Sequence, residues 1–157
     1  GDHPVEVVEA MSRICLGAES DPKTNISKHR VDGFFGKDDE AIAMAAMYTA
    51  NHSDVSAIVS ITESGDTPLR MSRIRTDIPI YAFSPSDKTL RKTCLFRDVY
   101  PVPFSLDDID NNNVYERVLS KLKQQELVAR GDKILITCGD FVGVRGSTNT
   151  MKIVEVV

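Results

Sequence analysis

Short apolar segments alternate with helix-compatible segments from residue 55 onward, and this order restricts the fold more than any other feature. Five segments rich in β-branched and apolar residues are predicted as strands, at 55–61, 78–83, 99–104, 133–138 and 151–157. Helices are predicted between them at 67–75, 84–96 and 113–128. Such alternation is typical of a mostly parallel sheet with right-handed crossovers and helices on both faces. The predicted fold is therefore α/β, a three-layer sandwich with a five-stranded sheet.

Local signals refine three of these elements. Ser84 is predicted to cap the helix after it, with Pro85 at the first helical position. Prolines in the third predicted strand favour a place near the edge of the sheet. Because only a loop, residues 139–150, joins the last two predicted strands, the final strand is expected to run antiparallel.

Two helices are predicted ahead of the alternating region. Pro4 suits the first turn of a helix in which apolar residues recur at helical spacing as far as Ala18. A polar connector, residues 20–36, separates this helix from the rest of the chain, and we predict a boundary there. Asp38 or Asp39 is predicted to cap a helix over residues 40–52, whose Ala-rich face allows close packing on a sheet.

Composition excludes several classes of protein. The 157 residues carry a net charge of −4, which disfavours a general nucleic-acid binder. No apolar run reaches about 18 residues, so no membrane span is predicted, and the first residues lack the pattern of a signal peptide. The three cysteines show no CxxC spacing, and we interpret Cys15, Cys94 and Cys138 as buried free thiols in a reducing cytoplasm.

The first polar loop, residues 62–67, lies between the first predicted strand of the alternating region and a predicted helix. Free N–H groups and the helix dipole at such a place favour an anion, and a phosphate fits best. Its hydroxyls add donors, and Gly65 allows close approach to the backbone. The alternative is an ordinary strand–helix turn in which Thr67 caps the helix. The loop matches neither a Walker sequence nor a GxGxxG fingerprint.

The second polar loop, residues 143–150, has similar chemistry. It contains two glycines, three hydroxyl side chains and one cation, Arg145, and it comes after the carboxyl end of another predicted strand. In a parallel sheet the two loops can face one crevice and hold a phosphorylated small molecule. The alternative is a glycine-rich connection between two strands of a hairpin.

No complete active site is visible in the sequence. The histidines are scattered, and none has an evident Ser or Cys partner in a nucleophile motif. The basic residues of the two predicted helices after the first polar loop are interpreted as exposed helix faces: Arg70, Arg73, Arg75, Lys88, Arg91 and Lys92.

Several segments together resemble the carboxyl-terminal third of pyruvate kinase. They are "PVEVVEAMSRICLGAE", "TESGDTPLRMSRIRTDIPIYAFS", "LFRDVYPVPF", "GDKILITCGDFVGVRGSTNT" and "MKIVEVV". "NISKHRVD" and "EAIAMAAMYTANH" are most similar to the bacterial branch that is activated by AMP or sugar monophosphates. The resemblance covers essentially the whole chain. It implies that residues 1–18 are the last helix of the catalytic barrel, and that residues 19–157 are the regulatory C domain.

The resemblance also implies which residues bind an effector. The family's effector-phosphate loop maps onto Thr62, Glu63, Ser64, Gly65, Asp66 and Thr67, and its effector-covering loop maps onto Gly143, Val144, Arg145, Gly146, Ser147 and Thr148. Asp66 stands where the family often has a basic or neutral residue. A carboxylate beside a phosphate is repulsive unless it turns outward, which favours a monophosphate over fructose 1,6-bisphosphate. AMP, ribose 5-phosphate and glucose 6-phosphate remain alternatives.

In the family, catalysis uses barrel residues that bind phosphoenolpyruvate, ADP, Mg²⁺ and K⁺. All of these would lie before Gly1, so the chain alone is expected to be inactive and to bind no metal cofactor. The resemblance further implies a cytoplasmic glycolytic enzyme that forms a tetramer through its C domains, with residues 151–157 near the subunit interface. No nucleic acid or membrane partner is expected.

Two other functions are compatible with the sequence. A free-standing assembly module would form a defined oligomer and bind no phosphate ligand. A small dehydrogenase-like enzyme needs a glycine fingerprint after its first strand, and because "TESGDTP" does not supply one, this alternative ranks last.

Overall fold

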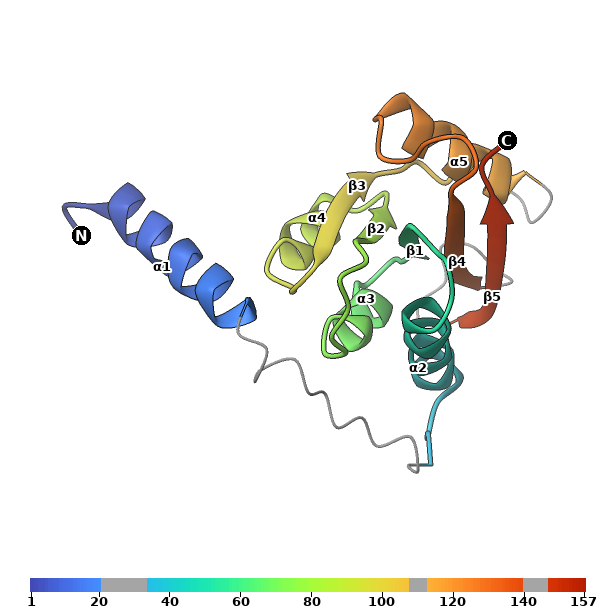
Figure 1. Ribbon diagram of the computed structural model, residues 1–157, viewed down its shortest axis with the longest axis horizontal. Helices are drawn as coiled ribbons and strands as arrows, with labels where there is room; N and C mark the ends of the chain where they lie inside the picture. The colour runs from blue at the N-terminus through green and yellow to red at the C-terminus, as the bar shows by residue number, and fades with distance from the viewer. Residues whose placement is uncertain (21–33, 108–112, 140–146) are drawn as a thin grey trace. The chain divides into compact units, whose positions relative to one another are not determined.

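The computed structural model describes residues 1–20, 34–107, 113–139 and 147–157 (Figure 1). The chain divides into two units, Gly1–Gly33 and Phe34–Val157. The first unit contains helix α1 (Pro4–Glu19), and the second contains the remaining elements that the structure describes.

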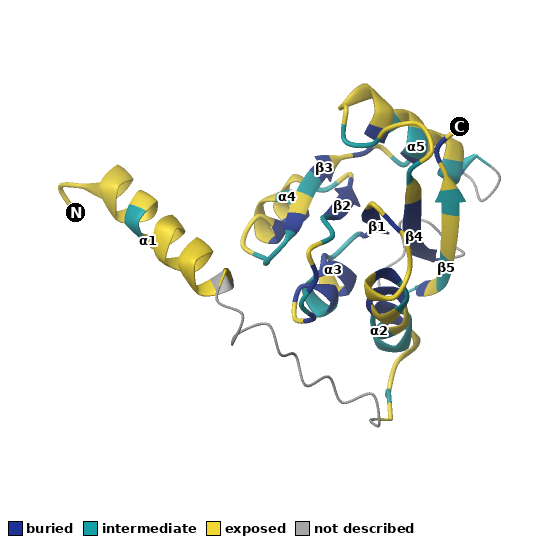
Figure 2. Ribbon diagram, in the orientation of Figure 1, coloured by how far each residue is buried: buried dark blue, intermediate teal, exposed yellow. Residues whose placement is uncertain are grey.

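Helix α1 begins as expected, with Pro4 in its first turn. Its apolar side chains are nevertheless exposed within this chain, among them Val5, Val8, Met11 and Ile14, and Figure 2 shows the helix almost entirely in the exposed colour. The assignment of this helix to a catalytic barrel stays a prediction.

The second unit is built on a five-stranded sheet. Its strands are β1 (Ala57–Ile61), β2 (Ile80–Ser84), β3 (Val99–Pro103), β4 (Lys133–Gly139) and β5 (Thr148–Glu155), in the order β3-β2-β1-β4-β5. All neighbours pair in parallel except β4 and β5, which pair antiparallel. The predicted α/β class, the edge position of β3 and the antiparallel last strand are confirmed.

Helices cover both faces of this sheet, because alternate residues of each central strand point to opposite sides (Figure 1). On one face, Val59 and Phe83 pack with Val118 and Leu122 of α5 (Val114–Gln124). On the other face, Ile58 and Ile80 of the sheet pack with apolar residues of α2 (Asp38–Asn51) and with Met71 of α3 (Asp66–Met71). Figure 2 shows the buried residues concentrated on the sheet and on the inward sides of these helices.

Two predicted helix starts are wrong. Helix α4 (Asp87–Thr93) is capped by Ser86, whose hydroxyl accepts the Thr89 N–H at 3.4 Å, whereas Ser84 is the last residue of β2. Pro85 therefore precedes the helix. Neither Asp38 nor Asp39 caps α2, since its N-cap is Lys37 and makes no side-chain capping bond. Both carboxylates instead lie in the first helical turn, where the dipole favours negative charge.

The cysteine interpretation is correct for one residue of three. Cys138, on β4, is buried and in no disulfide, whereas Cys15 and Cys94 are exposed. The burial of a cysteine depends on which face of its helix it occupies, and the number and spacing of cysteines do not predict that.

Over the described ranges, no helix is long and apolar enough to cross a membrane.

Leu122 tests the packing of α5 on the sheet. Its side chain is fully buried, so Leu122→Ala is expected to lower the free energy of unfolding by about 2–5 kcal/mol. Leu95→Ala is the matched control, because Leu95 is 87% exposed and its loss is expected to change stability by less than about 0.5 kcal/mol. Urea unfolding measures both, and equal effects would contradict the described packing.

Candidate functional site

The carboxyl ends of β1 and β4 lie side by side in the sheet. Ala57–Ser60 of β1 pair in parallel with Ile134–Thr137 of β4. From β1 the chain proceeds to β2 on one side, and from β4 it proceeds to β5 on the other. In open α/β sheets, ligands bind outside the carboxyl ends of strands at such a switch point. The first polar loop follows β1 at this point, and the segment that contains the second polar loop follows β4 in the chain.

The two polar loops touch at this point. The hydroxyl oxygens of Thr67 and Thr148 are 3.0 Å apart, and the two residues are only 4% and 7% exposed. Thr67 lies in the first turn of α3, and Thr148 is the first residue of β5, so the contact joins one end of each predicted loop. A crevice shared by the two loops stays a prediction, because Gly143, Val144, Arg145 and Gly146 lie outside the described residues.

The hydroxyl pair has an unused donor. Two threonine hydroxyls carry two protons, and their mutual hydrogen bond uses one. Within the described residues, neither hydroxyl has another hydrogen-bond partner. Within those residues the second proton therefore has no acceptor.

Hydrogen bonds inside the first polar loop hold its shape. The Gly65 N–H donates to the Thr62 hydroxyl at 2.9 Å, and the Asp66 N–H donates to the Ser64 hydroxyl at 3.4 Å. These bonds use two of the N–H groups that sequence reasoning treated as free. Over the described part of the chain, the N–H groups of Ser64 and Thr67 have no acceptor.

The helix after this loop starts earlier and is shorter than predicted. Helix α3 has six residues, Asp66–Met71, and its N-cap is Gly65 in the left-handed conformation. Thr67 therefore lies in the first turn and does not cap the helix. The interpretation of the segment as a turn capped by Thr67 is wrong, although a strand–helix turn is present.

Helix α4 supports the first polar loop from the neighbouring βα unit. The Thr89 hydroxyl donates to the Glu63 carbonyl at 2.7 Å, and the Lys92 ammonium donates to the Ser64 carbonyl at 3.0 Å. Lys92 also forms an ion pair with Asp66, with 3.3 Å between Nζ and Oδ1. Interpreting Lys92 only as an exposed helix face missed these contacts. Nothing in the local pattern identifies them, because the partners are more than twenty residues away in the sequence and are joined only by the β1–β2 pairing.

Charge around Asp66 favours its ionised form. Partial burial raises the pKa of the Asp66 carboxyl, but hydrogen bonds from Ser64 and Lys92 and the charges of Lys92 and Arg70 lower it more, so the pKa lies below its ordinary value of 3.8. Since the pKa is lower in the folded chain, the carboxylate stabilises the fold above about pH 4, and this contribution is lost as the pH falls through the folded-state pKa.

Glycine is required at two points of these loops. Gly65 has a φ of +78°, and a Cβ there would lie 3.1 Å from a methyl group of Thr93 on α4. Gly139 ends β4 at a bulge, and a Cβ there would collide with the backbone and hydroxyl of Ser147. These glycines allow α4 to approach the first loop and Ser147 to approach the end of β4.

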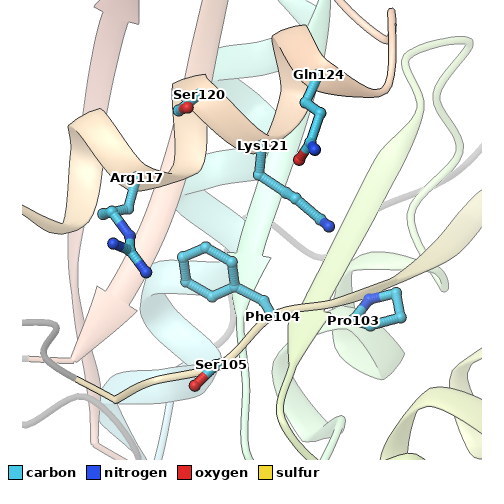
Figure 3. Close-up of a pocket in the computed structure, with 7 residues that line it drawn as sticks. All are labelled: Pro103, Phe104, Ser105, Arg117, Ser120, Lys121 and Gln124. Carbon is cyan, nitrogen blue, oxygen red and sulfur yellow. The ribbon is translucent and has the colours of Figure 1, made fainter.

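A pocket of about 320 Å³ opens at the carboxyl end of β3, on the same edge of the sheet (Figure 3). Arg117 and Lys121 extend into it from α5, on either side of the Phe104 ring in this view. The remaining lining residues are Pro103, Ser105, Ser120 and Gln124. Sequence reasoning did not select these cations. The polar face of α5 was a usable signal, because helical spacing places Arg117 and Lys121 on one side of the helix.

In the described parts of the chain, no group of three or more His, Cys, Asp or Glu side chains is arranged to hold a metal ion.

Residues 40–154 match the family model for the pyruvate kinase alpha/beta domain. The chain belongs to the pyruvate kinase family. It is similar to pyruvate kinase II of Salmonella typhimurium, with 45% identity over 99% of this chain and 32% of the relative. It is also similar to the pyruvate kinases of Buchnera aphidicola subsp. Acyrthosiphon pisum, with 41% identity over 100% of this chain and 33% of the relative, and of Haemophilus influenzae, with 39% identity over 96% and 30%.

The chain spans about a third of the length of these pyruvate kinase relatives. The matched region contains all five strands of the sheet, except the last residue of β5, and both polar loops. Membership of the pyruvate kinase family is therefore shown for the domain that carries the candidate site. The assignment of individual effector-binding residues stays a prediction.

Gly65 tests the geometry of the first polar loop. Gly65→Ala is expected to lower the free energy of unfolding by about 1–2 kcal/mol, because a Cβ is strained at positive φ, and it meets Thr93 as well. Gly36→Ala is the control, since its added Cβ meets no atom within 4 Å. A urea-unfolding midpoint that is equally unchanged in both variants would show that the left-handed turn is not present.

Proposed function

We propose that this chain is the effector-binding regulatory domain of a pyruvate kinase, and that the two polar loops form its site for the effector's phosphate group. The supporting observation is the buried contact between Thr67 and Thr148, which joins the loops at the switch point of a pyruvate kinase alpha/beta domain. Residues 62–67 would bind the phosphate, and the family resemblance implies that residues 143–148 form the effector-covering loop.

The available donors suit a phosphate. Its oxygens can accept the N–H groups of Ser64 and Thr67 and the second proton of the Thr67–Thr148 hydroxyl pair. The left-handed Gly65 leaves the backbone uncovered by a side chain at this point. Arg145 of the second polar loop would add a cation, as the family resemblance implies.

A monophosphate is the proposed effector class, with AMP, ribose 5-phosphate and glucose 6-phosphate as its members. Asp66 places a carboxylate on the loop, and its contact with Lys92 directs it toward α4. The pocket under α5 is separate from this site, because none of its lining residues belongs to residues 62–67 or to Ser147 and Thr148.

The whole enzyme would transfer a phosphoryl group from phosphoenolpyruvate to ADP and yield pyruvate and ATP, with Mg²⁺ and K⁺ bound outside this domain. Effector binding would shift a cytoplasmic homotetramer toward its active state, by the difference in affinity for the two states. We propose that residues 151–157 lie near a subunit interface, since β5 is an edge strand with Ile153 exposed.

A domain used only for assembly is the second candidate, and the same exposed edge strand favours it. Binding of phosphate esters distinguishes the two candidates, because a domain used only for assembly has no saturable affinity for them.

Calorimetric titration of this chain with AMP, ribose 5-phosphate and glucose 6-phosphate tests the proposal. Saturable binding of at least one is expected. Thr67→Ala removes one hydroxyl of the buried pair, and Ser64→Ala removes the hydroxyl that accepts the Asp66 N–H and holds the loop. Together they should weaken binding by about tenfold, since one hydrogen bond to a charged group contributes roughly 1.5–3 kcal/mol. Fructose 1,6-bisphosphate is expected to bind more weakly than the best monophosphate.

The matched control combines Ser53→Ala with Ser56→Ala. Both residues are exposed, and Ser56 precedes β1 at the opposite edge of the sheet, so binding should be unchanged. Affinity that survives the Ser64 and Thr67 substitutions would exclude the two-loop site, and a defined oligomer without any binding would favour the assembly domain.

A further inference from the structure

We infer that Lys92 and Asp66 together set the affinity and charge selectivity of the first polar loop: Lys92 attracts an effector phosphate, and Asp66 offsets that attraction. The inference rests on the phosphate site proposed above and adds to it a residue from another helix. The loop alone does not reveal the role of either residue.

The first polar loop has no cation of its own. Residues 62–67 contain two acidic side chains, Glu63 and Asp66, and no basic one. A phosphate dianion would therefore meet negative charge unless a neighbouring element supplies a positive one. Lys92 of α4 does so, with its ammonium 3.0 Å from the Ser64 carbonyl and 3.3 Å from the Asp66 carboxylate.

Arg70 is less available for this role, although it also lowers the pKa of Asp66. Its guanidinium is 3.0 Å from the Glu40 carboxylate and 3.7 Å from that of Asp39, at the start of α2. These contacts direct Arg70 toward α2. Lys92 is thus the described cation that directly contacts the first polar loop.

Lys92 can contact a ligand without leaving the loop. An ammonium group has three donors, and the Ser64 carbonyl and the Asp66 carboxylate use two of them. The Lys92 side chain is 43% exposed, so a ligand oxygen can reach the third donor. An ion pair this exposed is weak and can rearrange when a phosphate arrives.

Asp66 then determines which ligands the charge of Lys92 helps to bind. In the pair its carboxylate balances the charge of Lys92, and it repels further negative charge more strongly as the ligand's charge increases. A loop balanced in this way favours a ligand with a single phosphate group. Removing the carboxylate should therefore strengthen binding most for a bisphosphate.

Calorimetry on the whole chain tests the inference with AMP, ribose 5-phosphate and fructose 1,6-bisphosphate. Lys92→Met keeps the packing of the side-chain stem and removes the charge, and it should weaken monophosphate binding by about two- to fivefold, the range for exposed ion pairs. Asp66→Asn should strengthen monophosphate binding by a similar factor and bisphosphate binding by a larger one.

Two matched controls separate local contacts from net charge. Lys88→Met removes one positive charge, as Lys92→Met does, at an exposed residue of α4. Asp77→Asn removes one negative charge, as Asp66→Asn does, at an exposed residue before β2. Both should leave affinity unchanged. Equal effects of Lys92→Met and Lys88→Met, or of Asp66→Asn and Asp77→Asn, would overturn the inference.

A second readout does not depend on a ligand. Carbon-detected NMR titration should show that Lys92→Met raises the pKa of Asp66 and that Lys88→Met does not, and an unchanged pKa in both variants would overturn the pairing. The wild-type chain can bind the ligands, with an affinity that falls on substitution of Ser64 and Thr67 and stays unchanged on substitution of Lys92 or Asp66. In that case only the inference about the Lys92–Asp66 pair fails. If it binds none of them, the proposed function and the inference both fail.

Discussion

The parallel pairing of β1 with β4 is the constraint on which the candidate site depends. It brings together the carboxyl ends of two strands that are more than seventy residues apart in the chain. The loops that leave these ends then meet through the hydroxyls of Thr67 and Thr148. Apolar packing on both faces of the sheet holds the pairing in place, so the polar contacts at the loops do not have to supply the stability of the fold. Polar residues in the loops are therefore compatible with a stable fold.

Much of the fold was predictable because it depends on periodicity. Strand–helix alternation predicted the sheet, and the loop before the final strand predicted its antiparallel pairing. Capping was less predictable, because Ser84 and Ser86 are both reasonable caps and only the length of β2 decides between them. Residue types and strand ends identified both polar loops and their chemistry, and the family resemblance added the effector role. The start of α3, in contrast, depended on the left-handed conformation of Gly65.

The part of the site that sequence reasoning missed comes from contacts between elements. Lys92 has the spacing of an ordinary exposed helix residue, and its role appears only when α4 packs beside the first polar loop. Arg117 and Lys121 likewise become significant through the pocket beneath α5. The proposed site is therefore a product of tertiary packing: the loops supply hydrogen-bond donors, and the neighbouring helix α4 supplies a positive charge.

The most direct test of the central claim is an amide NMR titration of the ¹⁵N-labelled chain with ribose 5-phosphate. If the two polar loops form one phosphate site, the signals of Ser64, Thr67 and Thr148 should shift together along a single saturable curve. Shifts confined to residues of α5, such as Arg117 and Lys121, or the absence of any saturable shift, would contradict a site shared by the two loops.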